Sequence, residues 1–91
     1  MTETEFDLIN ELLSREKAAD AKMEFNKITP DNSLKYWMIK GRIEQKFQNW
    51  GEALNAYDKV LQLDKSNSKA KNNIAIIRGI LNFWNPEMFN P

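Results

Sequence analysis

The sequence predicts an all-α fold of about five antiparallel helices. Apolar side chains recur at helical spacing in five segments that are separated by short polar stretches. Only three Gly and three Pro occur among the 91 residues, so few positions break a helix. No segment alternates apolar and polar residues over six positions between turn signals, which argues against strands. Short turns make helices that follow one another in the chain antiparallel neighbours.

The first two predicted helices span about residues 3–13 and 16–28. The apolar stripe of the first consists of Phe6, Leu8, Ile9, Leu12 and Leu13, and that of the second of Ala18, Ala21, Met23, Phe25 and Ile28. Thr2, with Glu5 three residues later, predicts a capping box at the first helix. Residues 14–15 are expected to form a turn. Residues 29–33 form the clearest loop, because Pro30 removes Thr29 from helical geometry.

The remaining helices are predicted at about residues 34–47, 50–63 and 68–84. Asp31, Asn32 or Ser33 can cap the third helix, and Asn49 with Glu52 is expected to cap the fourth. Gly41 lies inside the third helix, where it costs about 1 kcal/mol relative to Ala. We therefore expect a neighbouring helix to approach it closely. Residues 64–67 predict a polar turn, and Pro86 ends the fifth helix before a tail at residues 86–91.

Charge and composition exclude several classes of protein. The formal net charge is +0, so no overall basic field attracts nucleic acid or an anionic membrane. Residues 1–32 carry eight acidic and four basic side chains, whereas the rest of the chain is mildly basic. The absence of Cys and His excludes disulfides, the usual zinc, haem and iron–sulfur ligand sets, and Cys–His or Ser–His–Asp catalysis. The acidic start contains no apolar signal-peptide core, and no apolar run has transmembrane length, so we expect a cytoplasmic protein.

An internal repeat connects the predicted helices. When the sequence is aligned with itself at a shift of thirty-four residues, Tyr36 matches Ala70, Gly41 matches Ala75, Ile43 matches Ile77 and Phe47 matches Leu81. At a shift of thirty-five Ala53 pairs with Ala18, Ala56 with Ala21, Val60 with Phe25 and Leu63 with Ile28. The match of two small residues at Gly41 and Ala75 is the most informative. A period near this length is typical of stacked helix pairs.

On these residues the chain resembles the tetratricopeptide repeat family, most closely in residues 34–67. Trp37 and Gly41 hold first-helix positions of that motif, and Ala53, Tyr57 and Val60 hold second-helix positions. Lys40, Glu44 and Lys65 depart from it where Leu, Tyr and Pro are usual.

The resemblance implies an α-solenoid of about two and a half repeats. Residues 1–33 resemble a degenerate first repeat that keeps Ala18 and Pro30. Residues 68–85 resemble the first helix of a third repeat and act as a capping helix, followed by the tail at residues 86–91.

The resemblance also implies a protein–protein or protein–peptide interaction module, such as a scaffold, without catalysis. In the family, first helices line a concave groove for a peptide. The positions that correspond here are Lys35, Met38, Arg42, Gln45, Lys46, Lys69, Asn72 and Ile76, and the first helix adds Asp7, Asn10 and Glu11. The groove is expected to be basic in its middle and acidic at one edge. The alternative is that these side chains form an ordinary solvated helix face.

The resemblance does not extend to the carboxylate clamp by which co-chaperones of the family grip the C-terminus of a heat-shock chaperone. The first helix offers acids in place of Lys and Asn, and Ile39 stands at the second Asn position. Only Lys69 matches, so no clamp is expected.

Other chemistry has weaker support. Trp37, Trp50 and Trp84 fit core packing better than base stacking, because neither charge nor motif indicates nucleic-acid binding. Carboxylate pairs such as Glu44/Glu52 or Asp58/Asp64 are better explained as surface charge than as acid–base pairs. No phosphate loop occurs, and no cofactor or metal is expected.

The fifth helix carries two apolar stripes. Ile74, Ile77, Leu81 and Trp84 are expected to pack on the fourth helix, whereas Ile76, Ile80 and Phe83 form a second stripe. Three explanations remain open for the second stripe. The tail folds back over it through Met88 and Phe89, two copies form a weak homodimer through it, or another protein or a following segment of a longer chain covers it. Fold-back is favoured, because Pro86 can reverse the direction of the chain. The homodimer corresponds to an alternative function, that of a self-associating structural subunit.

Overall fold

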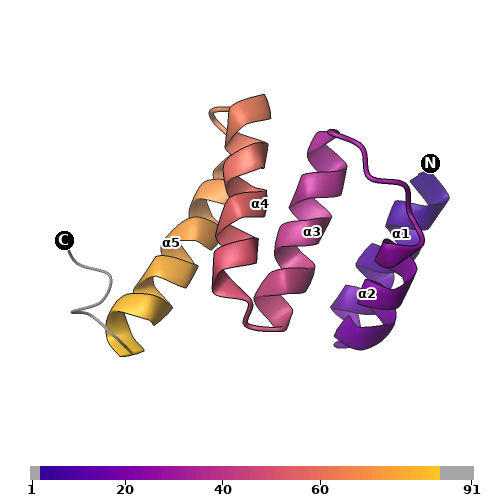
Figure 1. Cartoon of the computed structure of the whole chain (residues 1–91), viewed down its shortest axis with the longest axis horizontal. Helices are drawn as coiled ribbons and strands as arrows, with labels where there is room; N and C mark the ends of the chain where they lie inside the picture. The colour runs from indigo at the N-terminus through magenta and orange to yellow at the C-terminus, as the bar shows by residue number, and fades with distance from the viewer. Residues whose placement is uncertain (1–2, 85–91) are drawn as a thin grey trace.

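A computed structural model describes residues 3–84 of the chain, which fold into five helices (Figure 1). The helices are α1 (Glu3–Ser14), α2 (Ala18–Asn26), α3 (Leu34–Lys46), α4 (Trp50–Leu63) and α5 (Ser68–Trp84). No strand occurs within these residues, so the all-α prediction is confirmed.

Helix α2 is shorter at both ends than the sequence predicted. Glu16 has a φ of 61° and therefore lies in a turn, so the helix begins only at Ala18. At the other end the amides of Lys27 and Ile28 bond carbonyls three residues back, at 3.2 and 3.0 Å. This tightening of the last turn ends the regular helix at Asn26.

The helix caps follow the sequence in part. The Ser33 hydroxyl accepts a hydrogen bond from the Tyr36 amide at 3.1 Å, so Ser33 caps α3 as one of the three expected residues. Asn49 is the N-cap residue of α4 as expected, but its side chain makes no cap bond and instead donates to Glu44 Oε1 at 3.1 Å. Asn67 caps α5 by accepting from the Ala70 amide at 2.8 Å. The capping box at Thr2 lies outside the described residues.

The same turn joins α1 to α2 and α3 to α4. In each turn an amide bonds the carbonyl five residues back at 2.9 Å, from Lys17 to Leu12 and from Asn49 to Glu44. The preceding residue, Glu16 or Gln48, has a φ of 61°. This is the geometry of a Schellman motif with a non-glycine residue at the left-handed position.

Helix α3 lies in the middle of the molecule. It packs against α1 and α2 on one side and against α4 on the other, and α4 in turn packs against α5. Figure 1 shows the α1–α2 hairpin at one end of the row and α5 at the other.

Two apolar clusters fill the space between the helices. The first joins α1, α2 and α3 through Phe6, Ile9, Leu13, Ala21, Phe25, Ile28, Tyr36, Ile39 and Ile43. The second joins α4 and α5 through Ala53, Tyr57, Val60, Ala70 and Ile77. Trp37 packs against both clusters and Trp50 against the second, so these two Trp serve the core as predicted. The side chain of Trp84 lies outside the described residues.

The prediction for Gly41 is confirmed. A Cβ at this position would lie 2.6 Å from Cε1 of Tyr57, which is fully buried on α4. Ala75, which the repeat aligns with Gly41, is exposed. Helix α5 packs against α4, but within residues 3–84 no following helix covers α5 as α4 covers α3.

Candidate functional site

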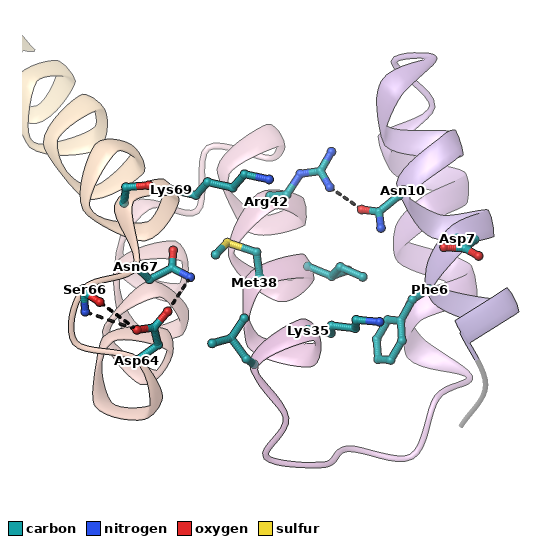
Figure 2. Close-up of a pocket in the computed structure, with 13 residues that line it drawn as sticks. Phe6, Asp7, Asn10, Lys35, Met38, Arg42, Asp64, Ser66, Asn67 and Lys69 are labelled. Atoms are coloured by element: carbon teal, nitrogen blue, oxygen red, sulfur yellow. Dashed lines mark hydrogen bonds between the residues drawn. The ribbon is translucent and has the colours of Figure 1, made fainter.

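A hollow lies between α1, α3 and the turn that joins α4 to α5 (Figure 2). Its volume is about 540 Å³. We call it the α1–α3 hollow. It is lined by Phe6, Asp7, Asn10, Leu34, Lys35, Met38, Ile39, Arg42, Asp64, Ser66, Asn67, Ser68 and Lys69.

Apolar side chains form part of the lining. Phe6 and Ile39 belong to the buried cluster between α1 and α3, and each exposes only a small part of its surface. Leu34 and Met38 are half-buried and pack against the cluster of α4 and α5. Since Leu34, Met38 and Arg42 recur at helical spacing, one face of α3 supplies the middle of the hollow.

The cationic part of the lining comes from α3 and α5. The Arg42 guanidinium donates a hydrogen bond to Oδ1 of Asn10 on α1 (Figure 2). That contact holds the guanidinium at the hollow without neutralising its charge. Lys69, from the first turn of α5, extends across the hollow toward Arg42.

The α4–α5 turn forms the opposite wall. The Asp64 carboxylate accepts hydrogen bonds from Ser66 Oγ and Asn67 Nδ2, both at 3.3 Å, and from the Ser66 amide at 3.4 Å. Asn67 also caps α5. These bonds fix the turn, so the wall that carries Lys69 is set by local sequence.

A second hollow of about 420 Å³ lies beside the first, and Arg42 lines both. The other lining residues are Gln45, Lys46, Gln48, Trp50 and Asn73. The Tyr57 hydroxyl donates to Oε1 of Gln45 at 2.7 Å, which fixes that amide. Burial raises the pKa of Tyr57 to about 12 despite the nearby charge of Arg42, so the hydroxyl remains a donor at neutral pH. Lys46 pairs with Glu16 at 3.2 Å.

The structure brings most of the predicted groove residues together. Lys35, Met38, Arg42 and Lys69 line the α1–α3 hollow, and so do Asp7 and Asn10, the predicted contributions of the first helix. Gln45 and Lys46 line the second hollow.

Three of the predicted groove residues lie elsewhere. Asn72 and Ile76 are exposed on α5 and line neither hollow. Glu11 pairs with Arg15 at 2.9 Å along the surface of α1.

Sequence reasoning missed the wall formed by the α4–α5 turn. Residues 64–67 were predicted only as a polar connection, although Asp64, Ser66 and Asn67 line the α1–α3 hollow. The available signal was Asn67, because an N-cap at that position fixes where α5 begins and so where Lys69 lies in its first turn.

Glu44 is a buried structural acid. It accepts hydrogen bonds from Lys22 at 3.3 Å and Asn49 at 3.1 Å, and Lys40 lies 3.7 Å away. Burial alone would raise the pKa of its carboxyl, but the bonds from Asn49 and Lys22, with the charges of Lys22 and Lys40, lower it overall. The carboxylate therefore stays ionised and ties α2 to α3, at the position where the resembled motif carries Tyr.

The two apolar stripes of α5 have different surroundings. Ile77 is fully buried, and Ile74 and Leu81 pack with it against α4, as predicted. In the second stripe Ile76 is 53% exposed, Phe83 is 80% exposed and Ile80 is half-buried. Met88 and Phe89, the residues expected to cover this stripe, lie outside the described residues.

Among residues 3–84, no cluster of acidic side chains has the number and closeness that a metal ion requires. No helix in this part of the chain combines the length and apolar character needed to cross a bilayer.

The chain matches no family model, and no curated protein or solved structure matches it significantly.

Proposed function

We propose that the protein is a non-catalytic interaction module that binds a segment of another protein in the α1–α3 hollow. The observation that carries the proposal is the composition of this hollow. It joins an apolar surface from α1 and α3 to a fixed Arg42 and a projecting Lys69. The resemblance of residues 34–67 to the tetratricopeptide motif supports the same function.

The size and chemistry of the hollow fit a peptide. A volume of about 540 Å³ lies within the roughly 300–1,000 Å³ of typical ligand sites. Phe6 and Met38 offer contact to an apolar side chain, while Arg42 and Lys69 offer hydrogen bonds and charge to carboxylates or backbone carbonyls. Such a site binds a short extended or helical segment through one apolar anchor and neighbouring polar groups.

Catalysis has no comparable support among the described residues. The buried acid, Glu44, is already engaged by two lysines and an amide, and it does not line the α1–α3 hollow. A general acid or base must reach a reacting group in a site, which this carboxylate does not.

The test uses peptides selected from a random library against the whole chain. Binding of the selected peptides is measured by fluorescence anisotropy, and the contacted residues are identified from NMR chemical-shift changes. We expect the amides of Met38, Arg42 and Lys69 to shift. Lys69→Glu should weaken binding about tenfold, equivalent to a loss of about 1.4 kcal/mol.

Lys59→Glu is the matched control. Lys59 is an exposed residue of α4 that lines a different, smaller hollow with Trp37 and Leu63. The two variants carry the same change of charge, so a general electrostatic effect would weaken binding equally. Selected peptides that shift only residues outside the α1–α3 hollow, or that bind both variants alike, would refute the proposal.

A further inference from the structure

The two ends of the helix row expose faces of complementary character. We propose that one copy of the chain docks the outer face of α5 onto the outer face of the α1–α2 hairpin of the next copy. The contact is head-to-tail, so it is distinct from the α1–α3 hollow and leaves that hollow open.

The outer face of α5 follows from the contacts of its inner face. Ile77 and Ala70 are fully buried against α4. Ala75 and Gly79, two residues before and after Ile77, therefore lie on the opposite side of the helix and are exposed. Ile76 borders this side and is 53% exposed. Small and branched apolar residues thus form a surface on which another helix can lie closely.

The internal repeat indicates what kind of surface fits there. Ala75 corresponds to Gly41, which receives the ring of Tyr57 from the following helix α4. No Cβ built on Gly79 meets an atom within 4 Å. The outer face of α5 therefore has room for side chains from a helix pair, but residues 3–84 supply none.

The outer face of the α1–α2 hairpin can be located in the same way. Asn10 of α1 bonds Arg42 of α3, and Lys22 of α2 bonds Glu44 of α3. At 100° per residue, Leu8 lies on the side of α1 opposite Asn10, and Glu24 lies on the side of α2 opposite Lys22. These sides point away from α3, at the far end of the row from α5 (Figure 1).

This end is apolar at its centre and acidic at its edge. Leu8 is 44% exposed and lines a hollow of about 280 Å³ with Glu5, Ile9, Glu24 and Lys27. A hollow of this size has room for an apolar side chain such as Ile76. Asp20 precedes Glu24 by one helical turn and lies on the same side.

Charge selects this pairing over contact between two α5 helices. Helix α5 carries Lys69, Lys71 and Arg78 and no acidic residue. Two such helices would bring like charges together, whereas the α1–α2 end offers Glu5 and Asp20, beside a Glu24 that already pairs with Lys27 at 2.9 Å. Within residues 3–84, neither Glu5 nor Asp20 has an ion-pair partner, and neither Lys71 nor Arg78 has one.

The test combines two blocked variants of the full chain. Gly79→Gln places a long side chain on the outer face of α5, at a position where an added Cβ meets no atom within 4 Å. Leu8→Lys removes the exposed leucine and adds a positive charge beside the acidic side chains at the other end. Solution mass is measured by sedimentation over a wide range of concentrations, at low and at high salt. Circular dichroism verifies that each variant folds.

We expect the mass of the wild-type chain to grow past a dimer with concentration and to fall with salt, because a head-to-tail contact does not close on itself. Each blocked variant alone should stay monomeric. An equal mixture should form a one-to-one dimer and nothing larger, because one intact face of each kind remains. Gly51→Gln is the matched control, since Gly51 is exposed on α4 and also meets no atom within 4 Å. It should assemble as the wild type does.

Two outcomes overturn the proposal. A wild-type chain that stays monomeric at every concentration shows that the two ends do not bind each other. A wild-type dimer that survives Leu8→Lys but is lost in Gly79→Gln shows that α5 pairs with α5 instead.

Discussion

Helices α3 and α5 correspond in sequence but differ in what surrounds them. Both bury an isoleucine at the same repeat position, Ile43 and Ile77. Beyond that, α3 is enclosed by α1 and α2 on one side and α4 on the other, whereas among the described residues α5 packs mainly against α4. The comparison shows that a repeat signal predicts the inner face of a helix. The next helix along the chain decides whether the outer face is buried.

The largest expected effect is a difference in folding stability between substitutions on the two faces of α5. Ile77→Ala removes a fully buried side chain and should lower the free energy of unfolding by about 2–5 kcal/mol. Ile76→Ala, its neighbour at 53% exposure, should change it by less than about 0.5 kcal/mol. Urea unfolding followed by circular dichroism measures both. Equal losses would contradict the assignment of inner and outer faces.

The next largest expected effect is a loss of folding stability at the enclosed face of α3. Gly41→Ala places a Cβ 2.6 Å from the buried ring of Tyr57, whose hydroxyl is held by Gln45 at 2.7 Å. The ring has little freedom to move, so we expect a loss of stability of about 1–3 kcal/mol. Tyr57→Ala in the same background tests the cause, because it removes the clash. The Gly41→Ala change should then cost less than it does beside Tyr57.

A similar loss is expected from Glu44→Gln, which removes the charge that ties α2 to α3. The variant leaves Lys22 and Lys40 without their carboxylate and should lose about 1–3 kcal/mol at pH 7. Because the folded-state pKa of Glu44 lies below its ordinary value of 4.5, the ionised form stabilises the fold above that pH. This stabilisation is lost as the pH falls through the lowered pKa.

Unfolding measured between pH 7 and pH 2 gives the matching control. The difference in stability between the wild type and Glu44→Gln should shrink as the pH falls below 4.5. A difference that stays constant with pH would show that shape, not charge, explains the role of Glu44.

The smallest expected effect is a gain in folding stability at the open face of α5. Gly79→Ala introduces no contact within 4 Å and replaces a poor helix former. It should raise the free energy of unfolding by up to about 1 kcal/mol. The measurement belongs at low protein concentration, where contact between copies is weakest. A loss of stability here would mean that the outer face of α5 is occupied within one copy.

The sequence predicted the helices and the residues of their inner faces well. Apolar spacing and few breaks placed α3, α4 and α5 to within one residue, and Gly41 indicated the close approach of α4. It did not predict the ends of α2, because Glu16 adopts a left-handed conformation that usually signals itself through glycine or asparagine.

The candidate site was predicted less completely. The residues of α1 and α3 that line the α1–α3 hollow follow from helical spacing, but Asp64 and Ser66 reach it through turn geometry that no periodicity reveals. Asn49 shows the same limit, since a residue with the chemistry of a cap instead bonds Glu44 in the folded chain. Which partner such a side chain bonds depends on its neighbours in the folded chain.

The most direct test of the account is the free energy of unfolding of Gly41→Ala and Gly79→Ala, measured side by side under identical conditions. Both are the same substitution inside a helix, so intrinsic helix propensity favours both equally. We predict opposite signs, a loss at Gly41 where α4 covers α3 and a gain at Gly79 where α5 is open. Changes of the same sign at both positions would contradict the contrast between the enclosed and the open helix.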